Sequence, residues 1–322
     1  MMKILTGIKP TGNGMHIGNY FGALKPLFDF AKGKEAYVFL PDFHSLTSVH
    51  DAETLRKNKV RMLKEFFALM PEDANIIVFE QSKVRRINDI TWILSSVTPY
   101  SLMLRAHSFK DAQNKNSDIN MAVFNYPILM TADIITYDID VVPVGKDQKQ
   151  HLEFARDIAE NFNKTYNCEV FKLPDSKIDE DFKIIPGTDG RKMSKSYDNF
   201  IGIFDDEKTM KKKIMSIVTG SESLEESKNP EICNVFALIK LFASKEKQDE
   251  IAAKYRAGNY GYGHAKLELL DLILEYFKEA RERFASFENN MDSIYEKLEA
   301  GNRIANEIAD KKYEEIVSVV GL

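Results

Sequence analysis

Two short stretches hold residue types that suit binding to a phosphate. Residues 6–20 read T-G-I-K-P-T-G-N-G-M-H-I-G-N-Y, with four glycines and the polar side chains of Thr11, His16 and Asn19. Glycine lets a ligand approach the backbone closely, and the start of a helix favours anions. Residues 191–196 read R-K-M-S-K-S and place two lysines three positions apart, which can bring cations and hydroxyl donors to a phosphate. Taken singly, each pattern also fits an ordinary turn or loop.

A lone carboxylate marks a third candidate position. Residues 124–137 read F-N-Y-P-I-L-M-T-A-D-I-I-T-Y and are apolar on nearly every side except at Asp133. On a helix, Tyr126, Met130 and Asp133 share one face. Burying a carboxylate is costly unless it is paired or hydrogen-bonded. Asp133 is therefore expected either to accept a hydrogen bond from a ligand N–H or to be a satisfied structural carboxylate.

The elements that position these residues alternate between strands and helices. Short apolar runs at residues 3–5, 36–40, 76–79 and 141–144 have the length of buried strands. Helical spacing is seen at residues 21–30 and at 51–70, where Asp51 is a suitable N-cap. This alternation predicts a doubly wound parallel α/β sheet, whose ligands lie beyond the carboxyl ends of the strands. Residues 145–151, which follow the fourth run, are polar and belong to that crevice.

The remaining segments are predicted to be helical or irregular. Residues 87–104 have a helical pattern that includes Trp92, a residue of the core or of an interface, and residues 109–120 read as a loop. Beyond Ile203 the strand pattern ends, and helices are expected at 235–241, 248–254, 265–287 and as a pair within 290–320 separated by Gly301. The predicted organisation is an α/β nucleotide-binding domain at 1–204 and an all-helical domain at 205–322.

The composition is that of an ordinary globular protein. The 322 residues are 44% hydrophobic and 29% charged, with a formal net charge of -5, which argues against nonspecific coating of DNA or RNA. Local basic faces remain possible at 83–86 and 208–213, although each also fits a solvated helix face. Without an apolar run of about 20 residues or a signal-peptide pattern, we expect no membrane span and a cytoplasmic location. Cys168 and Cys233 are expected to be reduced packing residues, and no metal site is predicted.

Considered together, the two signatures resemble a known family. The order H-I-G-N followed some 170 residues later by K-M-S-K-S is similar to class I aminoacyl-tRNA synthetases. The stretches Y-P-I-L-M-T-A-D-I-I-x-Y and V-P-V-G-K-D-Q-K-Q-H-L-E resemble the tryptophanyl-tRNA synthetase family within that class. The resemblance covers essentially the whole chain and implies a Rossmann-like catalytic domain. It also implies activation of L-tryptophan by ATP and transfer of the aminoacyl group to tRNA(Trp).

The resemblance implies roles for individual residues. His16, Lys192 and Lys195 would be catalytic, stabilising charge on the phosphates. The residues expected to bind ATP are Lys9, Pro10, Thr11, Gly18, Asn19, Gly145, Lys146, Asp147, Ile185, Lys192, Met193, Ser194, Lys195 and Ser196. The residues expected to bind tryptophan are Leu5, Gly7, Tyr126, Met130, Asp133, Val142, Val144 and Gln148, with Asp133 accepting the indole N–H.

The same resemblance implies partners. Mg²⁺ would arrive with ATP, the helices after Asp205 would bind the anticodon of the tRNA, and a helical insertion around 83–135 would form a homodimer interface. Lys9, Asn19 and Lys146 depart from the wider pattern, which usually has glutamine, histidine and glutamate there. The rival interpretations are a tyrosyl-tRNA synthetase, a non-catalytic paralogue that binds tRNA or tryptophan, and a small-molecule nucleotidyltransferase, although the last does not account for the helical C-terminal domain.

Overall fold

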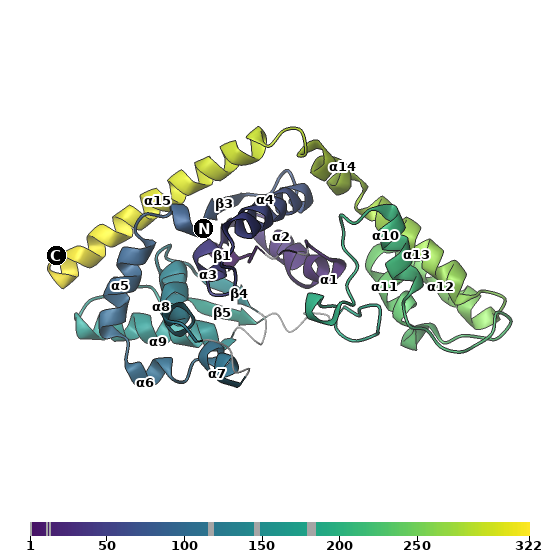
Figure 1. Cartoon of the computed structure of the whole chain (residues 1–322), viewed down its shortest axis with the longest axis horizontal. Coiled ribbons are helices and arrows are strands. Elements are labelled where there is room, and N and C mark those ends of the chain that lie inside the picture. The colour runs from purple at the N-terminus through teal and green to yellow at the C-terminus, as the bar shows by residue number, and fades with distance from the viewer. Residues whose placement is uncertain (1, 11, 13, 115–118, 145–148, 179–184) are drawn as a thin grey trace.

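A parallel sheet forms the centre of the α/β part of the chain (Figure 1). The computed structural model describes residues 2–10, 12, 14–114, 119–144, 149–178 and 185–322. Within these residues five strands pair in the order β3-β2-β1-β4-β5, and every pairing is parallel. The strands are β1 (Lys3–Gly7), β2 (Glu35–Leu40), β3 (Ile76–Glu80), β4 (Val141–Val144) and β5 (Asp175–Ile178). The doubly wound α/β fold predicted from the sequence is confirmed, and β5 is a strand that the sequence did not reveal.

Helices connect and cover the strands. Those of the α/β part are α1 (Ile17–Asn19), α2 (Lys25–Ala31), α3 (Asp42–Ser45), α4 (Ala52–Leu69), α5 (Ile87–Val97), α6 (Tyr100–Met103), α7 (His107–Asn114), α8 (Met121–Ile135) and α9 (Lys149–Thr165). A π-helical stretch, η1 (Tyr20–Leu24), joins α1 to α2, and a short 3₁₀ helix, η2 (Gln81–Lys83), follows β3. The Asp51 side chain accepts the Thr54 N–H and so caps α4 as predicted.

The two faces of the sheet bury two separate cores, because successive strand side chains point to opposite faces. Ile4, Ala36 and Val38 belong to one core, which continues into the helices after residue 205. Leu5 and Tyr37 belong to the other, which lies against α5, α8 and α9. Continuous apolar runs in β1 and β2 are therefore explained by burial on both faces.

The C-terminal region is helical, as expected. It contains α10 (Glu207–Met215), α11 (Asn234–Phe242), α12 (Lys245–Ala257), α13 (Tyr262–Tyr276), α14 (Lys278–Ser286) and α15 (Asp292–Val320). The 3₁₀ turn η5 (Pro230–Ile232) lies between α10 and α11, and another, η4 (Lys195–Tyr197), precedes this region. None of the helices in the described part of the chain is long and apolar enough to cross a membrane.

The prediction of two helices separated by Gly301 is wrong, because α15 is a single helix of 29 residues. Gly301 lies inside it, against the edge strand β3. A Cβ atom at this position would lie 1.9 Å from the Val78 carbonyl oxygen, so glycine here permits a close approach and does not end the helix. Figure 1 shows α15 returning from the helical region to the α/β part, where it contacts β3, α4 and α5.

One further prediction is corrected, and another is narrowed to one of its two alternatives. Residues 109–114 of the segment expected as a loop belong to helix α7, whose Phe109 packs edge-on against Phe124 of α8 with ring centroids 5.3 Å apart. Trp92, expected in the core or at an interface, is 80% exposed on α5, which excludes the core alternative and leaves the interface as the prediction. Cys168 and Cys233 are both free thiols, as expected.

Candidate active site

The two signature segments come together at the carboxyl edge of the sheet. The Gly18 N–H donates to the Met193 Sδ over 3.3 Å. Backbone hydrogen bonds extend the contact, because Ile17 N–H donates to the Ile201 carbonyl over 3.1 Å and Ile203 N–H to the Met15 carbonyl over 3.0 Å. A Cβ atom on Gly18 would lie 3.1 Å from the Met193 Cβ, so a glycine here allows this close approach.

His16 begins the first helix and is almost fully buried. Its Nδ1 accepts the Asn19 N–H over 3.2 Å, while the Asn19 side-chain oxygen accepts the His16 N–H over 3.2 Å. Burial, together with the charges of Lys195 and Lys213, lowers the pKa of His16 to about 4. His16 is therefore neutral near pH 7. Because Nδ1 is an acceptor, the proton resides on Nε2, which makes that atom a hydrogen-bond donor.

A buried carboxylate that the sequence reading missed supports this corner of the site. Glu65 of α4 accepts the Met15 N–H over 2.6 Å and the Arg61 Nε–H over 2.8 Å. Burial raises the pKa of Glu65, and Arg61 opposes that rise. Gly14 has a φ of +67°, and a Cβ there would lie 2.5 Å from the Glu65 Oε1, so glycine is required.

The loop that carries the two lysines is held by Asn199, another residue without a sequence signal. Its Oδ1 accepts the Ser194 N–H over 2.7 Å, and its Nδ2 donates to Asp189 and to the Lys192 carbonyl over 2.6 and 3.1 Å. Met193 N–H in turn donates to the Ile185 carbonyl over 2.8 Å. Burial lowers the pKa of Lys195, which therefore gives up its proton more readily than an exposed lysine.

Asp133 is buried on α8 and has two partners within the chain. Its Oδ2 accepts from Gln81 Nε2 over 2.7 Å and lies 3.0 Å from His44 Nε2. Burial raises the pKa of Asp133, while the hydrogen bonds from His44 and Gln81 oppose that rise. His44 follows the carboxyl end of β2, and Gln81 follows that of β3. The stretch P-D-F-H after β2 was visible in the sequence, but nothing in it identified Asp133 as the partner.

Among the described residues predicted to bind tryptophan, Tyr126 lies beside His44, a partner of Asp133, and the others lie in the strands and core on this side of the sheet. The Tyr126 ring lies 4.3 Å from the His44 ring, measured between centroids. Leu5 and Val142 are buried in the same core as Asp133's neighbours, and Met130 packs against that core. A Cβ on Gly7 would lie 3.0 Å from the Phe39 ring, so Gly7 leaves room for that side chain. Val144 ends β4 at the same edge of the sheet.

The other residues predicted to bind ATP or tryptophan can be described only in part. Thr11, Gly145, Lys146, Asp147 and Gln148 lie outside the described residues. Pro10 is buried, and Lys9 follows β1 at the carboxyl edge, where partial desolvation lowers the pKa of its side chain. Lys192 and Ser196 are exposed on the loop, and Ser194 is half-buried.

Two arginines of the basic group expected at 83–86 form ion pairs within the chain. Arg85 and Arg86 form ion pairs with Asp310 of α15 at 2.6 and 3.1 Å. Lys213 of the other basic group pairs with Asp205 over 2.8 Å and lies over the Phe200 ring, which is next to His16.

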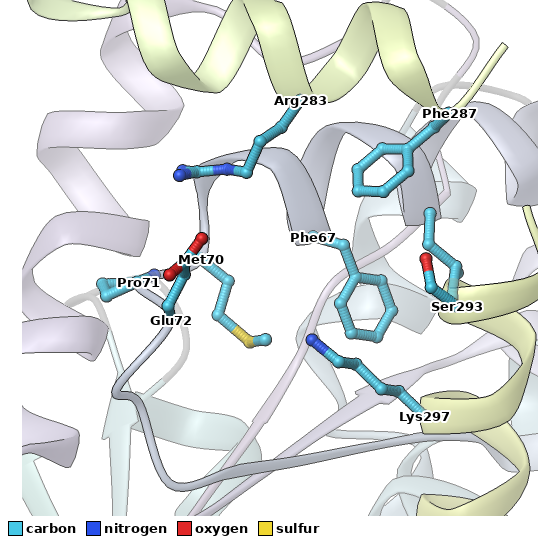
Figure 2. Close-up of a pocket in the computed structure, with 9 residues that line it drawn as sticks. Phe67, Met70, Pro71, Glu72, Arg283, Phe287, Ser293 and Lys297 are labelled. Atoms are coloured by element: carbon cyan, nitrogen blue, oxygen red, sulfur yellow. The ribbon is translucent and has the colours of Figure 1, made fainter. Parts of the chain in front are cut away.

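A cavity of about 200 Å³ lies away from these residues (Figure 2). It is lined by Phe67 of α4, Phe287 and Arg283, among others. Helix α4 leads into the amino end of β3. The cavity therefore opens near the amino-terminal edge of the sheet, opposite to the candidate site. Within the described residues there is no group of three His, Cys, Asp or Glu side chains that could hold a metal ion.

Comparisons with known proteins agree with this geometry. A sequence model of the family described as tRNA synthetases class I (W and Y) matches residues 1–278. The chain belongs to this family. The tryptophan–tRNA ligase of Fusobacterium nucleatum is 48% identical over 322 residues, which cover 100% of this chain and 98% of the relative. The ligase of Campylobacter jejuni is 42% identical over 321 residues, covering 100% of both chains.

A solved structure extends this similarity to three dimensions. The tryptophanyl-tRNA synthetase from Campylobacter jejuni, complexed with ADP and tryptophan, matches with a TM-score of 0.95 over 100% of both chains. At 42% identity, this class I synthetase has the same fold as the present chain over its full length.

Proposed function

We propose that the chain is a tryptophan–tRNA ligase. It activates L-tryptophan with ATP to give tryptophanyl-adenylate and pyrophosphate, and it then transfers the aminoacyl group to tRNA(Trp) and releases AMP. The observation that carries the proposal is the contact between Gly18 and Met193, which joins the two signatures of the family beside the carboxyl edge of the sheet. Charging of a tRNA(Trp) transcript with labelled tryptophan by the purified chain tests it, and absence of charging would contradict it.

In the first step, the tryptophan carboxylate attacks the α-phosphorus, and the bond to the bridging oxygen of pyrophosphate breaks. This chemistry needs positioning and charge stabilisation and no covalent enzyme intermediate. The neutral His16 donates through Nε2–H to a phosphate oxygen. Lys192 and Lys195 stabilise the charge that develops on the phosphates as pyrophosphate leaves.

The adenosine side of the site is assigned to the first signature. Gly18 and Asn19 contact the nucleoside, and Asp147 contacts the ribose. The remaining residues proposed to bind ATP are Lys9, Pro10, Thr11, Gly145, Lys146, Ile185, Met193, Ser194 and Ser196. Mg²⁺ enters as part of the ATP substrate, and its ligands in this proposal are phosphate oxygens.

The tryptophan side is assigned to the pocket around Asp133. Asp133 accepts the indole N–H, and the buried environment makes an unpaired N–H or carboxylate costly, which gives the site its selectivity. Tyr126, Met130 and Val142 form the walls, with Leu5 in β1 and with Gly7 and Val144 at the ends of β1 and β4. Gln148 contacts the ammonium group of the amino acid.

The helices after Asp205 are proposed to bind the anticodon of the tRNA. Lys208, Lys211 and Lys212 of α10 are available for phosphate contacts, which position a nucleic acid without reading its sequence. We propose a cytoplasmic location, where tRNA is charged for translation.

The proposal includes a homodimer formed through the helices of the insertion at 83–135. Support comes from large apolar side chains that lie exposed there, Trp92 at 80%, Tyr100 at 69% and Met121 at 67%. Exposed aromatic and methionine side chains are enriched at protein interfaces.

A further inference from the structure

Helix α15 covers the free edge of the sheet with a row of small and amide side chains. In the strand order, β3 has β2 on one side only, so its other edge needs a cover. Gly301 of α15 approaches the Val78 carbonyl closely. Asn302 follows Gly301 directly, and Asn306 lies about one helical turn further along α15. Figure 1 shows α15 running alongside β3.

The two asparagines bond the backbone of the segment that follows β3. The Asn302 Oδ1 accepts the Glu80 N–H over 2.8 Å. The Asn306 Oδ1 accepts the Arg85 N–H over 3.0 Å, and its Nδ2 donates to the Lys83 carbonyl over 2.8 Å. The segment 80–85 is therefore fixed at both ends by α15.

Between those ends lies Gln81, whose side chain holds the carboxylate of Asp133. The Gln81 Oε1 accepts the Phe43 N–H over 3.0 Å, and this fixes which end of the amide faces Asp133. The Gln81 Nε2 then donates to the Asp133 Oδ2 over 2.7 Å. The geometry of the Gln81–Asp133 hydrogen bond therefore depends on the position of segment 80–85 relative to α3 and α8.

A second set of contacts ties the same segment to the end of β2. Lys59 Nζ lies 2.6 Å from both Asp42 and Glu80, and Asp42 accepts the Ser82 N–H over 2.9 Å. Asp42 and His44 share the short helix α3, so a shift of segment 80–85 would disturb both partners of Asp133. The ion pairs of Arg85 and Arg86 with Asp310 fix the position of α15 along the segment.

We propose that Asn302 and Asn306 of α15 are positioning residues for tryptophan selection. They hold segment 80–85 so that Gln81, together with His44, keeps the Asp133 carboxylate aimed at the indole N–H. This inference rests on the proposed function and on the role of Asp133 in it. The C-terminal helix thereby contributes to the amino acid site without touching the substrate.

The test compares Asn302→Ala and Asn306→Ala with a control on the same helix in pyrophosphate exchange. Lys312→Met is the control, since the buried Lys312 anchors α15 to the Val170 carbonyl and to Asp138, away from segment 80–85. We expect the asparagine variants to raise the KM for tryptophan about tenfold, because a misdirected hydrogen bond weakens selection of the N–H. The KM for ATP and kcat should change less than about threefold, and Lys312→Met should leave the KM for tryptophan unchanged.

An analogue of tryptophan with sulfur in place of the indole N–H separates positioning from general loss of structure. The wild-type chain should prefer tryptophan over this analogue, and Asn302→Ala should reduce that preference about tenfold. A general loss of structure would instead reduce activity with both substrates equally and leave the preference unchanged. An unchanged preference, or an equal effect of Lys312→Met, would overturn the inference. If the wild-type chain fails to activate tryptophan at all, the proposed function fails instead.

Discussion

The Gly18 N–H and the Met193 Sδ lie 3.3 Å apart, although 175 residues separate them in the sequence. This contact brings the loop of Lys192 and Lys195 against the start of the first helix, where His16 is buried. Glu65 stabilises the first segment by accepting the Met15 N–H, and Asn199 stabilises the lysine loop by accepting the Ser194 N–H. The arrangement places cations and neutral donors together, as stabilisation of a charged phosphoryl transition state requires.

Replacement of Lys195 should slow tryptophan activation strongly. Loss of a group that stabilises transition-state charge typically costs about a hundredfold to a thousandfold in rate, and we expect that loss for Lys195→Ala. Pyrophosphate exchange measures it. Lys245→Ala, which removes an exposed lysine of α12 paired with Asp249, is the control. An exchange rate within a few-fold of wild type for Lys195→Ala would remove Lys195 from the mechanism.

Replacement of Asp133 should abolish tryptophan activation while the chain still folds. Asp133→Ala leaves the buried donor of Gln81 and the ring of His44 without their acceptor, which should lower the free energy of unfolding by about 1–3 kcal/mol. Exchange kinetics and a thermal unfolding curve, measured on the same preparation, separate the two effects. Unchanged kinetics with tryptophan would show that selection lies at another residue.

His16 should make the folded protein less stable in mild acid. The pKa of His16 is about 4 in the folded chain. Below about pH 6.5 this histidine therefore binds a proton in the unfolded chain but not in the folded chain. Stability from this group is complete above pH 6.5 and should fall by about 2 kcal/mol between pH 6.5 and 5. Urea unfolding of wild type and His16→Gln at both pH values isolates this difference. Identical pH dependence in the two proteins would contradict a buried neutral His16.

Gly301 should tolerate no side chain. Gly301→Ala places a Cβ 1.9 Å from the Val78 carbonyl oxygen, so α15 must move away from β3, at a cost of about 1–3 kcal/mol from overpacking. Gly263→Ala in α13 is the matched control, because a Cβ there meets nothing within 4 Å. That variant should be as stable as wild type or more so, by up to about 1 kcal/mol. Equal thermal unfolding midpoints for the two variants would contradict the close contact.

Strands and signatures could be predicted from the sequence because their information is local. Apolar runs indicate burial on both faces of a sheet, and Asp133 stood out because it interrupts an apolar helix. The pairing of Asp133 with His44 and Gln81 could not be predicted, because its partners come from 89 and 52 residues away and hydrophobic patterns carry no information on partners.

Other errors have the same physical origin. Gly301 reads as a helix end by propensity, but close packing against β3 outweighs the cost of a glycine within the helix. Residues 109–114 are mostly polar and were expected as part of a loop, yet contact between Phe109 and Phe124 helps to hold them as a helix against α8. In each case a tertiary contact decided the local structure.

Pyrophosphate exchange with tryptophan and with tyrosine in parallel tests the central claim most directly. The purified chain, given ATP and Mg²⁺, should exchange label into ATP with tryptophan. With tyrosine it should be slower by a factor on the order of 10⁴, because tyrosine offers no indole N–H to Asp133. Exchange with tyrosine at the same rate or faster, or with neither amino acid, would contradict assignment of the chain as a tryptophan–tRNA ligase.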